Sequence, residues 1–224
     1  MTPYARTAAL IGALALLALV PAAYAQQEFP PPQGKGRVVV MVSGVSGPSH
    51  YTEVAGEVAK LGYDVVLFDA NTMKGTRGNG LKVAIQQALA MPNALPGKVA
   101  LVGFSSGGGE SLYYGTQWPD QVAGVVVWYP ANFFIHDVPK FANQLQVPVV
   151  VFAGGKDNFR NGCCTAATDT VLQSAAKAAG KSFDLTIYPD ADHDFVKGGS
   201  NYNASDDADA FQRTSDALKK YLAN

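Results

Sequence analysis

Residues 103–107 read Gly-Phe-Ser-Ser-Gly and directly follow the apolar run at 99–102. In this G-x-S-x-G pattern a buried strand ends, the chain turns sharply and a helix begins. The turn exposes one serine hydroxyl, here that of Ser105, and leaves no room for a side chain at Gly103 or Gly107. Because glycine and serine are common in ordinary loops, the pentapeptide indicates a catalytic site only if an acid and a histidine follow later strands.

Short apolar, β-branched runs alternate along the chain with segments whose apolar residues recur every three or four positions. Such runs are typical of strands buried on both faces of a parallel sheet, and such segments of amphipathic helices. The sequence therefore predicts an α/β fold, a doubly wound and mostly parallel sheet that binds ligands at the carboxyl ends of its strands. The predicted strands are 38–42, 64–68, 98–102, 122–128, 147–152 and 183–188, and the predicted helices begin near residues 51, 79, 106, 168 and 205.

Residues 1–25 have the pattern of a secretory signal peptide. Arg6 precedes an apolar run over 8–20, and Ala23-Tyr24-Ala25 is a small-x-small cleavage motif. The run is short for a membrane-spanning helix, and an uncleaved anchor is the alternative. We therefore expect an exported protein, periplasmic or secreted. Its mature chain would have an extended segment over 26–36 and one domain over 37–224.

Charge and cysteine usage narrow the choice of partners and cofactors. The formal net charge is −1 and there is no basic tract, so we expect no nucleic-acid partner and no membrane partner after signal cleavage. The only cysteines, Cys163 and Cys164, are adjacent and could form a vicinal disulfide, remain as thiols or bridge to another chain. Two cysteines and three histidines do not favour a zinc site, and we expect neither metal nor cofactor.

Two residues that follow late strands complete a candidate triad with Ser105. His193 follows the last predicted strand and would accept the serine proton. Asp157 follows the strand before it, after a turn at Gly154-Gly155, and would orient the histidine. The alternatives are two histidines and the loop acids Asp190, Asp192 and Asp194, for which solvated or turn-forming roles are expected. His136 is expected to have a surface or packing role, whereas His50 could line the cleft but precedes the serine and has no obvious acid partner.

An acyl-transfer site also needs donors for the oxygen of the tetrahedral intermediate. One is the backbone N–H of Ser106, the residue after the nucleophile. The other is expected in the loop at 43–48, where small residues let the backbone approach a substrate, and we assign it to Gly44. The chain order Ser105, Asp157, His193 is that of the α/β-hydrolases.

These ordered segments resemble the dienelactone hydrolase family within the α/β-hydrolases. The resemblance implies a small, lid-poor α/β-hydrolase domain with its triad at Ser105, Asp157 and His193 and its second anion-hole donor at Gly44. Two features differ from the family pattern, which has a cysteine nucleophile where this chain has Ser105 and a glutamate at about Ser43. The matching segments are 38–47, 61–66, 98–108, 147–157 and 187–195.

The sequence thus predicts an exported serine hydrolase that cleaves carboxylic esters or related small acyl substrates through an acyl-enzyme on Ser105. Peptidases and acyltransferases use the same triad. A hypothesis from another class is a ligand-binding protein on the hydrolase scaffold with little or no turnover. In that case the loop at 161–164 would obstruct the cleft or face a partner.

Overall fold

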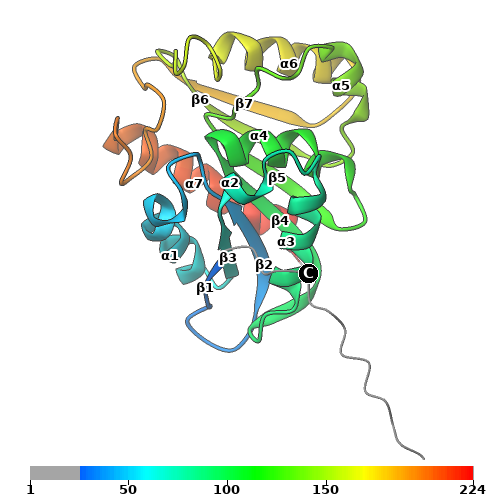
Figure 1. The fold of residues 1–224 in the computed structure, drawn as a ribbon, viewed down its shortest axis with the longest axis vertical. Helices are drawn as coiled ribbons and strands as arrows, with labels where there is room; N and C mark the ends of the chain where they lie inside the picture. Colours follow the sequence, from blue (N-terminus) through cyan, green and yellow to red (C-terminus); the bar gives the residue numbers. More distant parts are fainter. Residues whose placement is uncertain (1–25, 224) are drawn as a thin grey trace, which may run out of the picture.

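The computed structural model describes residues 26–223, and the predicted signal peptide at 1–25 lies outside them. Within these residues one seven-stranded sheet has the order β1-β3-β2-β4-β5-β6-β7 (Figure 1). Every neighbouring pair is parallel except β1 and β3. This confirms the predicted, mostly parallel α/β sheet. The strands are β1 (Gln26–Phe29), β2 (Gly36–Val42), β3 (Asp64–Phe68), β4 (Ala94–Phe104), β5 (Val122–Trp128), β6 (Val149–Gly154) and β7 (Phe183–Tyr188).

Helices cover both faces of the sheet, as the doubly wound prediction requires (Figure 1). Alternate strand residues point to opposite faces, so Val39 and Met41 pack under one helix layer while Val38 and Val40 pack under the other. One face carries α1 (Thr52–Lys60) and α7 (Ala204–Tyr221). The other carries α2 (Ala70–Met73), α3 (Asn79–Leu89), α4 (Ser105–Tyr113), α5 (Val138–Gln144) and α6 (Ala166–Ala178). None of the helices within residues 26–223 is long and apolar enough to cross a bilayer.

The six predicted strands and five predicted helices are all present. Five further short elements accompany them within the described residues: β1, α2, α5 and the 3₁₀ helices η1 (Pro48–Tyr51) and η2 (Gly115–Gln117). β1 lies in the predicted extended segment and pairs antiparallel with β3 at the sheet edge, where its polar residues are only partly buried. The helices α2 and α5 span four and seven residues and are too short to show a clear helical period. Asp69 and Asp137 cap them by accepting backbone N–H groups.

The turn from β4 into α4 is packed directly against the end of β2. Ser105 has a φ of 49°, in the left-handed region that most side chains avoid. The Gly107 N–H donates to the Ser43 carbonyl over 3.1 Å. A Cβ atom at Gly107 would collide with the carbonyl oxygens of Val42 and Ser43, and one at Gly103 would lie 2.5 Å from the Gly107 oxygen. The two glycines of the motif are therefore required by the fold.

We expect Gly107→Ala to lower the free energy of unfolding by about 2 kcal/mol or more, because backbone atoms must move to admit the methyl group. Urea titration of the purified variant measures this change. Gly56→Ala is the matched control, since Gly56 lies within α1 and the nearest atom to an added Cβ is 4.0 Å away. That control should raise stability by up to about 1 kcal/mol. Equal stability of the two variants would contradict the close packing at Gly107.

Candidate active site

Ser105, His193 and Asp157 form a continuous hydrogen-bonded chain at the carboxyl ends of β4, β7 and β6. The Ser105 Oγ lies 3.0 Å from His193 Nε2, and His193 Nδ1 lies 2.7 Å from Asp157 Oδ2. An ionised carboxylate can only accept, so Nδ1 carries the proton and Nε2 is free to accept the serine O–H. All three side chains are buried, with exposed fractions of 4%, 6% and 4% for Ser105, His193 and Asp157.

The imidazole of His193 is held on several sides. The Phe159 ring stacks on it with centroids 4.3 Å apart and planes 7° from parallel, and the Tyr129 ring meets it edge-on. The His193 N–H donates to Asp192 over 2.7 Å, and the Asn201 amide donates to the His193 carbonyl over 2.7 Å. These contacts fix both the ring plane and the backbone beneath it.

Asp157 is held by the turn that leaves β6. Its Oδ1 accepts the Phe159 N–H over 3.0 Å, while its Oδ2 faces the histidine. The turn runs against the end of β7, where the Gly155 N–H donates to the Tyr188 carbonyl over 2.8 Å. A Cβ at Gly155 would meet the Pro189 backbone at 2.7 Å. The sequence signal of two glycines before Asp157 therefore reflects close packing of two neighbouring strand ends.

The two residues assigned to an anion hole differ in their surroundings. Ser106 lies at the start of α4 and lines the cavity at Ser105. A Cβ atom built at Gly44 would lie 3.2 Å from the Ser105 Cβ, so the backbone of this loop passes close to the serine. The next residue, Val45, lines the space around Ser105 on both sides. The loop at 43–48 thus reaches Ser105 as expected, and the assignment of the second donor to Gly44 stays a prediction.

A buried polar network joins this loop to the histidine loop. Asp194 has a φ of 68° and is 9% exposed. Its carboxylate accepts from His50 Nε2 over 3.0 Å, from the Ser200 N–H over 2.9 Å and from the Tyr129 hydroxyl over 3.4 Å. The sequence favours a solvated or turn-forming role for Asp194 and shows no obvious acid partner for His50. They lie 144 positions apart, and no local pattern reveals that they pair.

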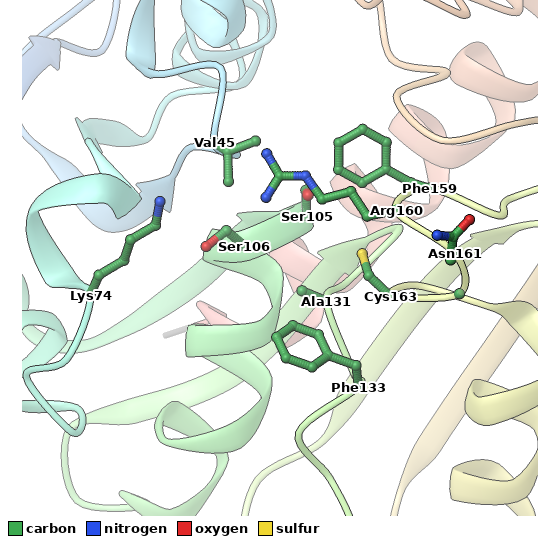
Figure 2. Close-up of a pocket in the computed structure, with 11 residues that line it drawn as sticks. Val45, Lys74, Ser105, Ser106, Ala131, Phe133, Phe159, Arg160, Asn161 and Cys163 are labelled. Carbon is green, nitrogen blue, oxygen red and sulfur yellow. The ribbon is translucent and has the colours of Figure 1, made fainter.

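Two cavities meet at Ser105, and Figure 2 shows the lining of the larger one. The larger has a volume of about 470 Å³, within the range of small-molecule sites, and the smaller about 90 Å³. The larger is lined by Val45, Lys74, Ser105, Ser106, Ala131, Phe133, Phe159, Arg160, Asn161, Gly162 and Cys163. The smaller is lined by Val45, Ser46, Tyr51, Ser105, Phe159, His193, Asp194, Ser200 and Asn201.

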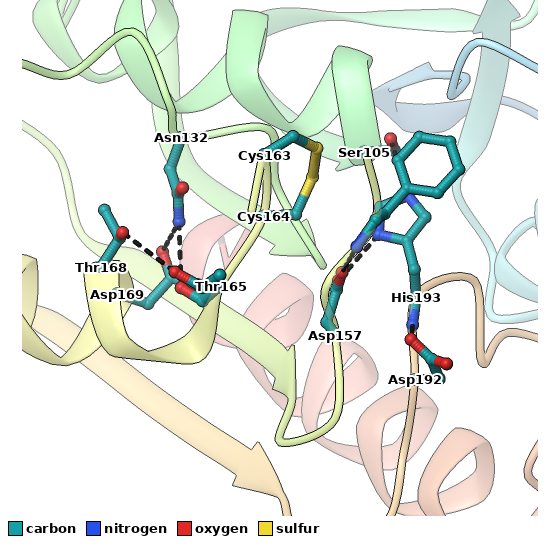
Figure 3. Close-up of a disulfide and its surroundings, with 11 residues drawn as sticks. Ser105, Asn132, Asp157, Cys163, Cys164, Thr165, Thr168, Asp169, Asp192 and His193 are labelled. Carbon is teal, nitrogen blue, oxygen red and sulfur yellow. Dashed lines mark hydrogen bonds and ion pairs between the residues drawn. A yellow bond between two sulfur atoms is a disulfide. The ribbon is translucent and has the colours of Figure 1, made fainter. Parts of the chain in front are cut away.

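Cys163 and Cys164 form a vicinal disulfide beside the triad (Figure 3). Cys163 lines the larger cavity, and Cys164 is fully buried. Within residues 26–223, ligand atoms of Asp157, Cys164 and His193 come within 4.8 Å of one another, the one grouping that could hold a metal ion. The Cys164 sulfur is bonded to Cys163 there and is not the thiolate that metals bind.

This chain resembles known proteins both in sequence and in fold. A model of the dienelactone hydrolase family matches residues 66–222. A Methylorubrum extorquens protein named "Putative carboxymethylenebutenolidase" is 30% identical over 150 residues, which cover 63% of this chain and 49% of that protein. The match thus spans about half the length of this relative.

Solved structures share the fold. A Klebsiella pneumoniae protein described as a "Putative Dienelactone Hydrolase" superposes with a TM-score of 0.71 at 19% identity, covering 90% of this chain and 100% of that one. Thermogutta terrifontis esterase 2, phosphoramylated by tabun, superposes with a TM-score of 0.68 at 16% identity, covering 89% and 90%. At these identities the likeness establishes the arrangement of strands and helices.

A buried pair, Asp169 and Asn132, lies on the side of the disulfide away from Ser105 and His193 (Figure 3). The Asn132 amide donates to Asp169 Oδ1 over 2.8 Å, while Asp169 Oδ2 and Asn132 Oδ1 have no hydrogen-bond partner. Burial raises the pKa of Asp169 to about 7, despite the hydrogen bond from Asn132, and the charge of Asp157 adds to the rise. When Asp169 is protonated, its carboxyl group gains an O–H, so this pair of acceptor oxygens gains a hydrogen-bond donor.

A raised carboxyl pKa makes the folded protein hold a proton that the unfolded chain releases. Stability should therefore fall as the pH rises from about 4 to about 7 and level off above that. We expect Asp169→Asn to reduce this fall and to be more stable than the wild type at pH 8, because the amide stays neutral. Urea titrations at pH 4.5, 6 and 8 measure it. Asp120→Asn is the control, since Asp120 is exposed. If the stability of Asp169→Asn depended on pH as that of the wild type does, the raised pKa would not belong to Asp169.

Proposed function

Because the chain belongs to the dienelactone hydrolase family and is a hydrolase, we propose that it cleaves carboxylic esters or related small acyl substrates through an acyl-enzyme on Ser105. One observation carries the proposal. The hydrogen-bonded path from the Ser105 hydroxyl through His193 to Asp157 has the distances and the order of a nucleophile, a base and an orienting acid.

In the first half of the reaction the Ser105 Oγ attacks the ester carbonyl carbon while His193 Nε2 takes the serine proton. The negative charge that develops on the carbonyl oxygen is stabilised by the N–H groups of Ser106 and Gly44. Gly44 passes close to Ser105, and its neighbour Val45 lines the space around the serine. Asp157 stabilises the imidazolium.

In the second half the carbon–oxygen bond to the alcohol breaks, and His193 gives its proton to the leaving oxygen. Water then enters next to the histidine, loses a proton to Nε2 and attacks the acyl carbon, which releases the acid and restores the Ser105 hydroxyl. The stacked Phe159 and the edge-on Tyr129 support this exchange, because they keep one ring orientation through both proton transfers. No step requires a metal or a cofactor.

We expect Ser105→Ala to lower kcat/KM for p-nitrophenyl butyrate by roughly a thousandfold or more, since nothing else supplies the attacking oxygen. Ser174→Ala, at an exposed site on α6, is the control and should match the wild type. A fluorophosphonate probe should label the wild type on the peptide that contains Ser105. The phosphoramylated Thermogutta esterase makes an organophosphorus probe the natural choice. Equal hydrolysis by Ser105→Ala and wild type would favour the ligand-binding alternative.

We also propose that the protein is exported after cleavage of a signal peptide. The support for this proposal is the composition of residues 1–25, with Arg6, the apolar run and the small residues Ala23 and Ala25. When the full chain is produced in a bacterial host, the periplasmic or culture fraction should contain a protein whose first residue by mass spectrometry is Gln26. Replacing Ala23 and Ala25 with leucine should block cleavage and leave the longer chain with the membrane fraction. An uncleaved, unexported wild-type chain would contradict the proposal.

A further inference from the structure

The two cavities at Ser105 differ in their relation to the catalytic histidine. His193 lines the smaller cavity and not the larger one, whereas Ser105 and Val45 line both. In the proposed reaction His193 must protonate the leaving oxygen, so the alcohol part of the ester lies on the histidine side. Ser106, whose N–H faces the oxyanion, lines the larger cavity, and the acyl part lies there.

The two cavities differ in size, and this difference limits the alcohol part of the ester more than the acyl part. At about 90 Å³ against about 470 Å³, the smaller cavity suits the shorter part of the ester, a small alcohol. Its walls are partly polar, from Ser46, Ser200 and Asn201, and partly apolar, from Val45, Tyr51 and Phe159. The larger cavity, at about 470 Å³, has apolar surfaces from Ala131, Phe133 and Phe159. It suits an acyl chain of six or more carbons.

The larger cavity also carries an uncompensated positive charge. Lys74 and Arg160 line it, and no acidic residue does. Figure 2 shows the two side chains entering from opposite sides, with Ser106 between their charged ends and Arg160 passing across Ser105 in this view. Within residues 26–223 neither cation forms an ion pair with a carboxylate: Lys74 donates to the Asn71 side chain, and Arg160 lies over the Phe159 ring at 5.3 Å.

The backbone that carries Arg160 is held in an uncommon conformation. Arg160, Asn161 and Gly162 have φ values of 48°, 58° and 99°, three left-handed residues in succession. Two hydrogen bonds close the turn, from the Gly162 and Cys163 N–H groups to the Phe159 carbonyl over 3.2 and 3.0 Å. Non-glycine residues in this region carry a cost of about 1 kcal/mol each that surrounding structure must offset. The turn thereby keeps Arg160 at the cavity.

We propose that the preferred substrates are esters of a short alcohol with a longer acyl chain that ends in a carboxylate, which Arg160 and Lys74 bind at the mouth of the larger cavity. This inference rests on the proposed function and adds to it the identity of both halves of the substrate. Arginine is suited to the task, because its guanidinium binds a carboxylate through two parallel hydrogen bonds.

Three esters separate the effects of charge and of orientation. Monomethyl adipate carries the terminal carboxylate, methyl hexanoate has the same acyl length without it, and pentyl acetate is the isomer of methyl hexanoate with the long chain on the alcohol. Acid release is followed in a pH-stat. We expect kcat/KM to be at least about tenfold lower for methyl hexanoate than for monomethyl adipate, which is the effect of one charge-assisted hydrogen bond. For pentyl acetate we expect it to be lower again by at least about tenfold.

For each variant the kcat/KM for monomethyl adipate is divided by the kcat/KM for methyl hexanoate. A general loss of activity lowers both values and leaves this ratio unchanged. Arg160→Gln should bring this ratio to about one, and Lys74→Gln should lower it severalfold. Lys177→Gln removes a positive charge from the exposed surface of α6 and should leave both the ratio and the rates unchanged.

A wild-type ratio of one or less, an unchanged ratio in Arg160→Gln, or equal rates for methyl hexanoate and pentyl acetate would overturn the assignment of the cavities. So would a failure to cleave any of the three esters by protein that the fluorophosphonate still labels at Ser105. The proposed function fails separately, if Ser105→Ala cleaves these esters as fast as the wild type does.

Discussion

The contact between the start of α4 and the end of β2 is the constraint on which the site depends. Gly107 lies against the carbonyls of Val42 and Ser43 and hydrogen-bonds to the latter. This contact holds the turn at Ser105 in its left-handed conformation and brings the loop that contains Val45 to the same place. The positions of Ser105 and of the loop at 43–48 therefore depend on one packing arrangement, because neither the turn nor the loop can shift without the other.

A second arrangement joins the proposed chemistry to substrate binding. Arg160 lies over the Phe159 ring, and that ring stacks on His193. The same short segment ends in the disulfide of Cys163 and Cys164, whose buried sulfur lies beside Asp157. The wall of the larger cavity and the support of the triad are thus one continuous piece of chain. A change in this segment should affect both the rate and the choice of acyl group.

Much of the site follows from sequence because the strands are parallel. Residues that come just after parallel strands meet at one edge of the sheet, so Ser105, Asp157 and His193 could be brought together by their order alone. Hydrophobic pattern in the sequence does not reveal β1, α2 or α5. The edge strand β1 is polar, and the helices α2 and α5 are shorter than the span in which helical periodicity shows. The pairing of His50 with Asp194 leaves no local pattern at all.

By itself the sequence determined the family and the doubly wound sheet and predicted that Ser105, Asp157 and His193 would meet, because hydrophobic period, glycine spacing and chain order are local properties of the chain. The tertiary structure decided which side chains surround Ser105, where Val45 lines both cavities. It also decided that Lys74 and Arg160 share one cavity with Ser105. Contacts between residues far apart in the chain follow from packing in three dimensions, which no local pattern records.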